Sequence, residues 1–479
     1  MQQDQTYQSP LSGRYASPAM QAIWSSHRKF STWRRLWLAL AESQQELGLP
    51  ITNEQITEIR AHLDDIDQDA AAKYERELRH DVMAHVHALG DLAPTARPII
   101  HWGATSQFVN CNTELLQLRD GLRLLAAKVA RVIDALGSFA AQYRELPTLG
   151  FTHYQPAQPV TVGKRATLWA QDLALSLDEL EFRLDSLRFR GVRGATGTQA
   201  SFLALFEGDH EKVERLDELV CERMGWPVDR RFSVTGQTYP RLVDAQILSA
   251  LAVTAAALHR LCTDLRLLAN RKEIEEPFER SQIGSSAMPY KRNPMRCERA
   301  TGLSRFVMNL PPNALQTAAN QWMERTLDDS ANRRLVLPEA FLALDGALDI
   351  MHNVCGGLVV YEATIRANLM AELPFMASEN LMMAAVTRGA DRQAAHEVIR
   401  AHAQQAAERV KRDGAKNDLL DRLRGEAMFD GVDLDAVMDP SAYIGRAPEQ
   451  VDGFIREVVA PIRARYAEAI KSERPELAV

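Results

Sequence analysis

Three segments of the chain carry apolar residues at every third or fourth position over about 30 residues, roughly three times the length of an average helix. Their seams consist of Leu115, Leu118, Leu122, Leu125, Val129, Val132 and Leu136, then Leu173, Leu177, Leu180, Leu184 and Leu187, and finally Ile247, Leu251, Leu258, Leu261, Leu265 and Leu268. Each segment is expected to form a helix about 45 Å long. Helices of this length are marginal alone in water, so they must pack together. The sequence therefore predicts an elongated helical bundle, which helical stretches at 297–308 and 333–359 would complete.

Shorter helical patterns flank the long segments. After residue 360 we expect Pro374 to break a helix, and Ser378 and Asp391 to serve as helix N-caps. Strand signals are few, apart from a short piece at 231–234. The fold class is therefore predicted to be all-α with three helical domains, namely an N-terminal domain at 1–106, a central long-helix bundle at 107–360 that is expected to form the core of an oligomer, and a C-terminal domain at 361–479.

Charge and composition exclude several classes of function. The chain has 56 basic and 63 acidic residues, a formal charge of -7, and no block of like charges, which argues against a nucleic-acid or anionic membrane surface. The longest apolar run, at 247–258, is too short to span a bilayer, and the polar first ten residues lack the pattern of a secretory signal. We therefore expect a cytoplasmic protein without a membrane partner. Its five scattered cysteines are expected to be reduced structural thiols.

The stretch SQIGSSAMPYKRNP, from Ser281 to Pro294, differs from its helical surroundings. A glycine followed by two serines offers hydroxyls and closely spaced backbone N–H groups, and Lys-Arg-Asn adds positive charge and further donors. Such a loop suits a carboxylate whose negative charge grows during a reaction. The alternative is a flexible polar connection that happens to be basic.

Several segments together resemble the fumarase/aspartase superfamily of lyases. The string GSSAMPYKRNP is similar to the loop that this superfamily shares, and its AMPYKR portion resembles the form found in members that act on succinylated purine nucleotides. The other resembling segments follow the family's order and are SPLSGRYAS (9–17), RHDVMAHVH (79–87), GATS (103–106), LGFTHYQPAQP (149–159), TGTQASF (196–202), TGQTY (235–239), ERTLDDSANRR (324–334) and ELPFMASEN (372–380). They extend over most of the chain.

The resemblance implies an enzyme that eliminates fumarate from adenylosuccinate to give AMP, and from SAICAR to give AICAR. It also implies a homotetramer whose active sites are shared between subunits, and no cofactor. In this β-elimination a proton leaves the succinyl carbon beside one carboxylate, and the C–N bond to the purine amino group breaks. The weakly acidic proton requires a strong base and an electrostatic cradle, and the departing nitrogen requires an acid.

Roles for individual residues follow from the same resemblance. Ser285 matches the general base, and a serine can act so only if desolvation and nearby cations such as Lys291 favour its alkoxide. His153 matches the general acid, with Glu298 keeping it protonated. His80 matches both a catalytic and a substrate-contacting residue. The substrate contacts implied by the family are Arg14, Tyr15, Arg79, His80, Asp81, Thr105, Ser106, Thr152, Gln237, Asn293, Arg299, Arg325, Ser330 and Arg334.

Two of these motifs could also suggest a metal site. The cluster of His80, His85 and His87 lacks the HExxH spacing, and the Asp328–Asp329 pair lacks a second acidic motif, so no metal is expected.

Other functions remain as alternatives. Sister lyases acting on argininosuccinate or fumarate, or a cycloisomerase, share the fold and the Gly-Ser-Ser loop. A helical scaffold without catalysis predicts degraded motifs where this chain has intact ones.

Overall fold

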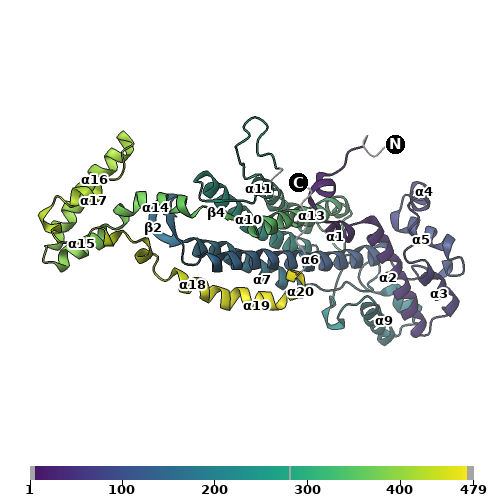
Figure 1. Cartoon of the computed structure of the whole chain (residues 1–479). Helices are drawn as coiled ribbons and strands as arrows, with labels where there is room; N and C mark the ends of the chain where they lie inside the picture. The colour runs from purple at the N-terminus through teal and green to yellow at the C-terminus, as the bar shows by residue number, and fades with distance from the viewer. Residues whose placement is uncertain (1–5, 280–281, 472–479) are drawn as a thin grey trace.

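The computed structural model describes residues 6–279 and 282–471. Helices dominate this part of the chain, with two small two-stranded sheets beside them. The molecule is elongated, and its longest helices run side by side along its middle (Figure 1). The predicted all-α class is confirmed.

The central helices are α6 (Ser106–Gln142), α7 (Val162–Ser186), α10 (Leu242–Asn270), α11 (Met295–Met308), α12 (Pro311–Ala319) and α13 (Asp329–Cys355). They pack on one another through the apolar seams seen in the sequence, whose members Leu118, Leu177 and Leu258 are completely buried. Helix α6 alone has 37 residues, which corresponds to a length of about 55 Å. This helix separates the two ends of the molecule.

Helix α10 is long and apolar enough to cross a membrane by length and composition alone, since its most apolar window has a mean hydropathy of 1.5. The expectation that the run at 247–258 is too short therefore does not hold for the whole helix. Half of that window is buried inside the protein, and the helix packs against α7, α11 and α13. Core helices meet the same criterion, so the finding is weak evidence for a membrane span.

The N-terminal elements gather at one end of the bundle. They are η2 (Leu11–Tyr15), α1 (Pro18–Ile23), α2 (Ser26–Glu46), α3 (Asn53–Ala61), α4 (Gln68–Leu78), α5 (Asp81–Leu92) and η3 (Arg97–Ile99). Helices α8 (Ala200–Leu205) and α9 (His210–Arg223) and η4 (Val228–Arg230) lie in the connection between α7 and α10, and α9 packs on α2.

The C-terminal part begins with α14 (Glu362–Met376), α15 (Ser378–Thr387), α16 (Arg392–Asp413), α17 (Leu419–Leu423) and the short turns η5 (Ala427–Phe429), η6 (Ala436–Met438) and η7 (Pro440–Tyr443). The chain then returns to the bundle through α18 (Ala447–Phe454), η8 (Ile455–Val459), α19 (Ala460–Arg465) and α20 (Ala467–Lys471). A separate buried cluster, which includes Leu381, Leu419 and Phe429, holds the first of these parts together. The predicted domain limits stay a prediction.

Two local predictions in this region were wrong. Pro374 lies inside α14, in its last turn, and Ser378 is the first residue of α15, whose N-cap is Ala377. The hydroxyl of Ser378 donates instead to the carbonyl of Phe375 at 2.5 Å. The predicted N-cap Asp391 is confirmed, because its carboxylate accepts from the backbone N–H of Ala394 at 2.8 Å.

A β-hairpin at the far end of α6 was not predicted. Strands β1 (Pro147–Thr152) and β2 (Gln155–Thr161) pair antiparallel, and β3 (Ile274–Glu275) pairs with β4 (Val359–Val360). Prolines at two positions of β2 hide its strand pattern, since proline is rare inside sheets. The predicted piece at 231–234 contributes only an isolated bridge, between Arg231 and Phe189.

The five cysteines are free and buried, as expected from the sequence. Burial raises the pKa of Cys221 to about 12 and that of Cys355 further still, so neither forms a thiolate at neutral pH. The cysteines therefore act as core residues.

Candidate functional site

Five of the predicted substrate contacts meet at the start of α13. Arg325, in the preceding loop, donates to the side-chain oxygen of Gln237 at 3.0 Å and to the hydroxyl of Ser330 at 3.5 Å. Arg334 donates to the carboxylate of Asp81 at 2.9 Å. The three contributing segments are far apart in the sequence, so the fold itself assembles this cluster, called the α13 cluster below.

A buried carboxylate underlies the α13 cluster. Asp329 is completely buried, and its Oδ2 accepts from Nε of Arg241 at 2.8 Å, while Oδ1 lies 3.5 Å from Nη2 of Arg325. Removing either partner would leave a charge without compensation in a dry environment. Asp329 therefore fixes the direction of the Arg325 guanidinium. The Asp328–Asp329 pair thus orders a loop, and only the second aspartate is buried.

A second buried ion network lies beside the first. The guanidinium of Arg333 pairs with Glu114 at 2.8 Å and with Asp244 at 2.7 Å, and it donates to the phenol oxygen of Tyr239 at 2.5 Å. Burial alone would raise the pKa of Glu114, but Arg333 and Arg241 outweigh this effect and lower it. The carboxylate is therefore charged at neutral pH. Sequence reasoning missed this network because its members come from three separate segments, and Glu114 and Asp244 lie inside helical patterns.

The Arg-His-Asp motif occupies the junction between α4 and α5. Arg79 ends α4 in the left-handed region with φ of 56°, and His80 is the N-cap of α5. Nδ1 of His80 accepts from the backbone N–H of Met83 at 3.3 Å, which leaves Nε2 to carry the proton of a neutral ring. The imidazole is half-exposed and lies 3.8 Å from Asp81. Its Nε2–H is thus available to a ligand.

Thr105 and Ser106 form the N-terminus of α6, with Thr105 as the N-cap residue. A helix N-terminus carries unpaired backbone N–H groups that favour an anion. The preceding His101, which the sequence analysis did not single out, has φ of 66° and accepts from the indole N–H of Trp37 at 2.9 Å. Burial lowers the pKa of His101 to about 4, so its ring is neutral. Its position just before the GATS segment is the sequence signal that could have pointed to His101 as a residue near the site.

His153 stands at the tip of the β1–β2 hairpin. Thr152 pairs with Gln155, so His153 and Tyr154 are the two residues of the turn, with φ of 54° and 55°. Two positive φ values are the geometry of a type I′ turn, which usually contains asparagine and glycine. Residues with side chains adopt this backbone at a cost in strain, which is typical of functional positions. The turn presents both side chains to solvent.

The loop that carries Ser285 projects from the bundle between α10 and α11 (Figure 1). Its first residue, Ser281, lies outside the described part of the chain. Oγ of Ser285 accepts from the backbone N–H groups of Ala287 at 3.3 Å and Met288 at 3.1 Å. Two N–H dipoles aimed at one oxygen favour its negatively charged form. Lys291 is exposed in the same loop.

The base of this loop is closed by backbone contacts. Asn293 donates from Nδ2 to the carbonyl of Gly284 at 2.8 Å, where an added Cβ would collide with the carbonyl of Lys291. Glu298 and Arg299 follow in the first turns of α11, and Glu298 lies 3.8 Å from Arg266. Within the described chain Glu298 has no hydrogen bond to His153.

Arg14 and Tyr15 belong to the N-terminal segment, which crosses α13. The backbone of Tyr15 packs against Gly346, twelve residues after Arg334 and about 18 Å further along the helix. The Arg14 side chain is exposed. This segment therefore contributes a second group of predicted contacts on the same helix.

One chain does not bring all predicted site residues together. Thr105 begins α6, whereas His153 follows its other end, so about 55 Å of helix separates them. Figure 1 shows the same separation, with β2 near one end of α6 and α4 and α5 near the other. The predicted residues form separate groups in the α13 cluster, the N-terminal segment, the hairpin and the Ser285 loop.

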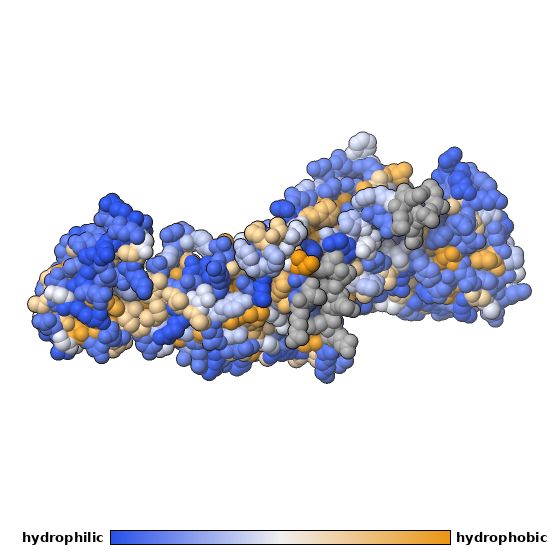
Figure 2. Space-filling model, turned by 45° about the horizontal axis from the view of Figure 1, so that its top comes forward, coloured by the Kyte–Doolittle hydropathy of each residue, from blue (hydrophilic) through white to orange (hydrophobic). Residues whose placement is uncertain are grey.

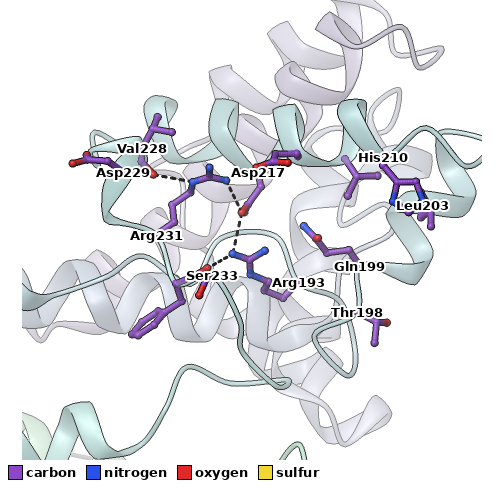
Figure 3. Close-up of a pocket in the computed structure, with 13 residues that line it drawn as sticks. Arg193, Thr198, Gln199, Leu203, His210, Asp217, Val228, Asp229, Arg231 and Ser233 are labelled. Atoms are coloured by element: carbon purple, nitrogen blue, oxygen red, sulfur yellow. Dashed lines mark hydrogen bonds and ion pairs between the residues drawn. The ribbon is translucent and has the colours of Figure 1, made fainter.

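A cavity of about 540 Å³ lies beside α9 and contains none of the predicted residues. Asp217 stands between two arginines on its wall, 2.8 Å from Arg231 and 3.2 Å from Arg193 (Figure 3). Both guanidinium groups are therefore held by the same buried carboxylate. Its Arg193 loop continues to Gly197, which packs tightly on the carbonyl of Thr235. The cavity wall therefore supports the backbone that leads to Gln237.

Nothing in residues 6–279 and 282–471 groups three or more histidine, cysteine, aspartate or glutamate side chains as a metal site would require. His85 is instead stacked on Phe30 with ring centroids 3.8 Å apart, and burial lowers its pKa to about 4. A neutral, stacked imidazole is a core residue.

Comparison with known proteins identifies the family. Residues 13–309 match the family described as lyase, and residues 374–454 match the adenylosuccinate lyase C-terminus. Adenylosuccinate lyase of Schizosaccharomyces pombe is 50% identical, and that of Saccharomyces cerevisiae 49%, each over 99% of both chains. The solved structure of 3-carboxy-cis,cis-muconate lactonizing enzyme from Pseudomonas putida covers 95% of this chain, and this chain covers 99% of it, with a TM-score of 0.80 and 24% identity, which shows a shared fold. The chain belongs to the adenylosuccinate lyase family of the fumarase/aspartase superfamily.

Proposed function

We propose that this protein eliminates fumarate from adenylosuccinate to give AMP, and from SAICAR to give AICAR, in purine nucleotide biosynthesis. The observation that carries the proposal is the near 50% identity to named adenylosuccinate lyases along the whole chain. The α13 cluster supports it, since Arg325 and Arg334 offer the planar, paired donors that suit a nucleotide phosphate. The protein is a carbon–nitrogen lyase.

The direct test is fumarate release by the purified protein from adenylosuccinate, SAICAR and argininosuccinate. We expect release from the two purine substrates and none from argininosuccinate. Ser285→Ala protein serves as the control for contaminating lyases. Release from argininosuccinate alone would overturn the proposal in favour of a sister lyase.

Ser285 acts as the base in this proposal. Its Oγ already accepts two backbone N–H groups, which would stabilise an alkoxide once water is excluded. Lys291 of the same loop adds positive charge for the alkoxide and for the aci-carboxylate that forms when the succinyl proton leaves. Oγ takes the proton, and the electron pair of the C–H bond passes to the carboxylate.

His153 acts as the acid. As an imidazolium it gives its proton to the purine amino nitrogen while the C–N bond breaks. The electron pair of that bond stays on nitrogen, and the pair held by the aci-carboxylate moves back to form the C=C bond of fumarate. Glu298 holds the imidazolium charged from its place on α11. His80, with a free Nε2–H, contacts the substrate at the other end of the molecule.

A site built from several copies of the chain reconciles these roles with the 55 Å separation. We propose a homotetramer in which the hairpin and Ser285 loop of two copies reach the α13 cluster of a third. Apolar side chains exposed on the bundle support such an assembly; α7 carries Leu168, Leu175 and Phe182 at seven-residue spacing, and Val253 and Leu267 are exposed on α10. Figure 2 shows apolar patches along the length of one face.

Mixing two inactive variants tests the shared site. His153→Ala and Ser285→Ala proteins are unfolded together, refolded and compared with each variant refolded alone. If the two groups come from different copies, mixed tetramers contain some sites with both groups intact, so activity returns. Light scattering verifies the tetramer, and a purified mixed tetramer without activity would refute the shared site.

A further inference from the structure

A buried ion triad lies between α6 and α13, next to the place where the N-terminal segment packs on Gly346. Nζ of Lys128 on α6 lies 2.5 Å from Oδ1 of Asp345 and 2.7 Å from Oδ2 of Asp349, both on α13. Asp345 is completely buried, and Lys128 and Asp349 are nearly so. The triad therefore joins two of the longest helices through charges that are removed from water.

Joining two helices by such a triad has a high cost in free energy, because three charges must be removed from water. The neighbouring positions Leu125 and Val129 on α6 and Leu344 and Leu348 on α13 are completely buried and apolar. Replacing buried ion pairs by apolar side chains is often neutral or stabilising, so helix packing alone does not require the triad. One carboxylate would also suffice to neutralise the lysine.

The two carboxylates differ in what else they touch. Oδ2 of Asp345 accepts from the backbone N–H of Ser17 at 2.6 Å, whereas within the described part of the chain Asp349 is hydrogen-bonded to Lys128 alone. The next residue, Gly346, lies under Tyr15, where an added Cβ would stand 2.7 Å from the Tyr15 carbonyl oxygen. Asp345 and Gly346 thus form a seat on α13 for the backbone of 15–17.

Besides this seat, η2 packs on α13, and Tyr15 is partly buried against the core. Between residues 6 and 17, Leu11 and Ala16 are the buried side chains. The hydroxyl of Ser17 also caps α1 by accepting from the N–H of Met20 at 3.3 Å. The carboxylate of Asp345, which Lys128 holds in place, therefore fixes the position of this segment on α13 at Ser17.

We propose that Asp345 is a positioning residue for the elimination reaction: through the Ser17 N–H and the close fit of Gly346 under Tyr15, it sets the place of Arg14 and Tyr15 in the substrate site. The inference rests on the proposed function, which makes those two residues substrate contacts. Asp345 itself touches no substrate, because it is buried beneath the segment that does.

Asp345→Asn and Asp349→Asn form a matched pair, since each leaves Lys128 one carboxylate and only the first disturbs the segment. The asparagine introduced by Asp345→Asn has one side-chain oxygen, which cannot accept from both Ser17 and Lys128, and its NH₂ group would face one of these donors. We expect both variants to lose similar thermal stability, and only Asp345→Asn to raise KM for adenylosuccinate, by about tenfold, with a smaller change in kcat.

Gly346→Ala displaces the same segment without altering a charge, so it covers the case in which Asp345→Asn does not fold. It should raise KM in the same direction. Equal KM values for Asp345→Asn, Gly346→Ala and the unaltered enzyme, or an equal rise in the Asp349→Asn control, would overturn the proposal.

Arg14→Ala separates this inference from the proposed function beneath it. If Arg14→Ala raises KM while the Asp345 and Gly346 variants do not, the substrate contact stands and the positioning role is wrong. If Arg14→Ala leaves KM unchanged, the segment does not bind substrate and both statements fail.

Discussion

The α13 cluster and the Ser285 loop carry functional residues in opposite ways. In the cluster, Arg325 rests on the buried carboxylate of Asp329, and the supporting charges are out of contact with water. In the loop, Tyr290 is 83% exposed, and within residues 6–279 and 282–471 the hydroxyl of Ser285 is bonded only to neighbouring backbone N–H groups. The residues proposed to bind substrate are therefore oriented by the fold of one chain, whereas those proposed to transfer protons need a further surface to exclude water.

The largest effect should follow from removing one of the two groups proposed to transfer protons. Ser285→Ala or His153→Gln should lower kcat by about 10³-fold or more, since general acid–base catalysis contributes up to about 10⁴-fold. Because the His153 side chain is exposed and that of Ser285 is only partly buried, the melting temperature should change little. Steady-state kinetics and calorimetry measure the two quantities, and a large loss of stability would erase the contrast between the regions.

An intermediate effect is expected from Asp329→Asn in the cluster. Breaking a buried ion pair costs about 3 to 5 kcal/mol, so unfolding should become easier and KM should rise as Arg325 loses its support. The exposed neighbour provides the control, because Asp328→Asn should change neither. Urea unfolding and substrate titration check both outcomes, and a rise in KM without loss of stability would show that the buried charges do not hold the cluster.

The smallest effect concerns His85 in the core of the N-terminal end. Its pKa of about 4 lies below the ordinary 6.5, so the unfolded chain binds a proton that the folded protein rejects, and stability falls as pH drops from 6.5 towards 4. Between pH 7 and pH 5 the loss should be about 2 kcal/mol.

His85→Phe keeps a ring against Phe30 and abolishes this titration. The variant should therefore lose about 2 kcal/mol less than the unaltered protein over the same pH interval, with kcat unchanged at pH 7. Denaturant titrations at both pH values measure these losses. An identical loss of stability in the variant and the unaltered protein would contradict the lowered pKa of His85.

The long helices could be predicted because apolar periodicity is a local property of sequence. The expected stretch at 297–308 corresponds to α11, which spans Met295–Met308. The hairpin could not be predicted from the same signal, because its turn uses His153 and Tyr154 in place of the usual glycine and asparagine. Tertiary packing and function override local preference at such a turn.

The motifs pointed to Arg325 and to the Asp328–Asp329 pair, but not to Arg241, which holds Asp329 in place. Arg241 and Asp329 are 88 residues apart, and Arg241 lies at the start of a helix without a distinguishing pattern. Ion pairs between distant segments depend on how helices pack, which sequence spacing does not encode. A resemblance to a family therefore identifies candidate site residues, whereas the ion pairs that orient them are found only in the structure.

In the proposed tetramer the two ends of helix α6 belong to different active sites, so the length of the helix sets the distance between its contributions to them. Inserting or deleting one residue within it would rotate everything beyond that point by about 100° and shift it by about 1.5 Å. The turn that carries His153 would then be misaligned with the neighbouring copy in that tetramer, even though the local helix remained intact. Length changes during evolution should accordingly accumulate in the peripheral connections, and the number of residues between Ser106 and Gln142 should be as strictly kept as any side chain of the site.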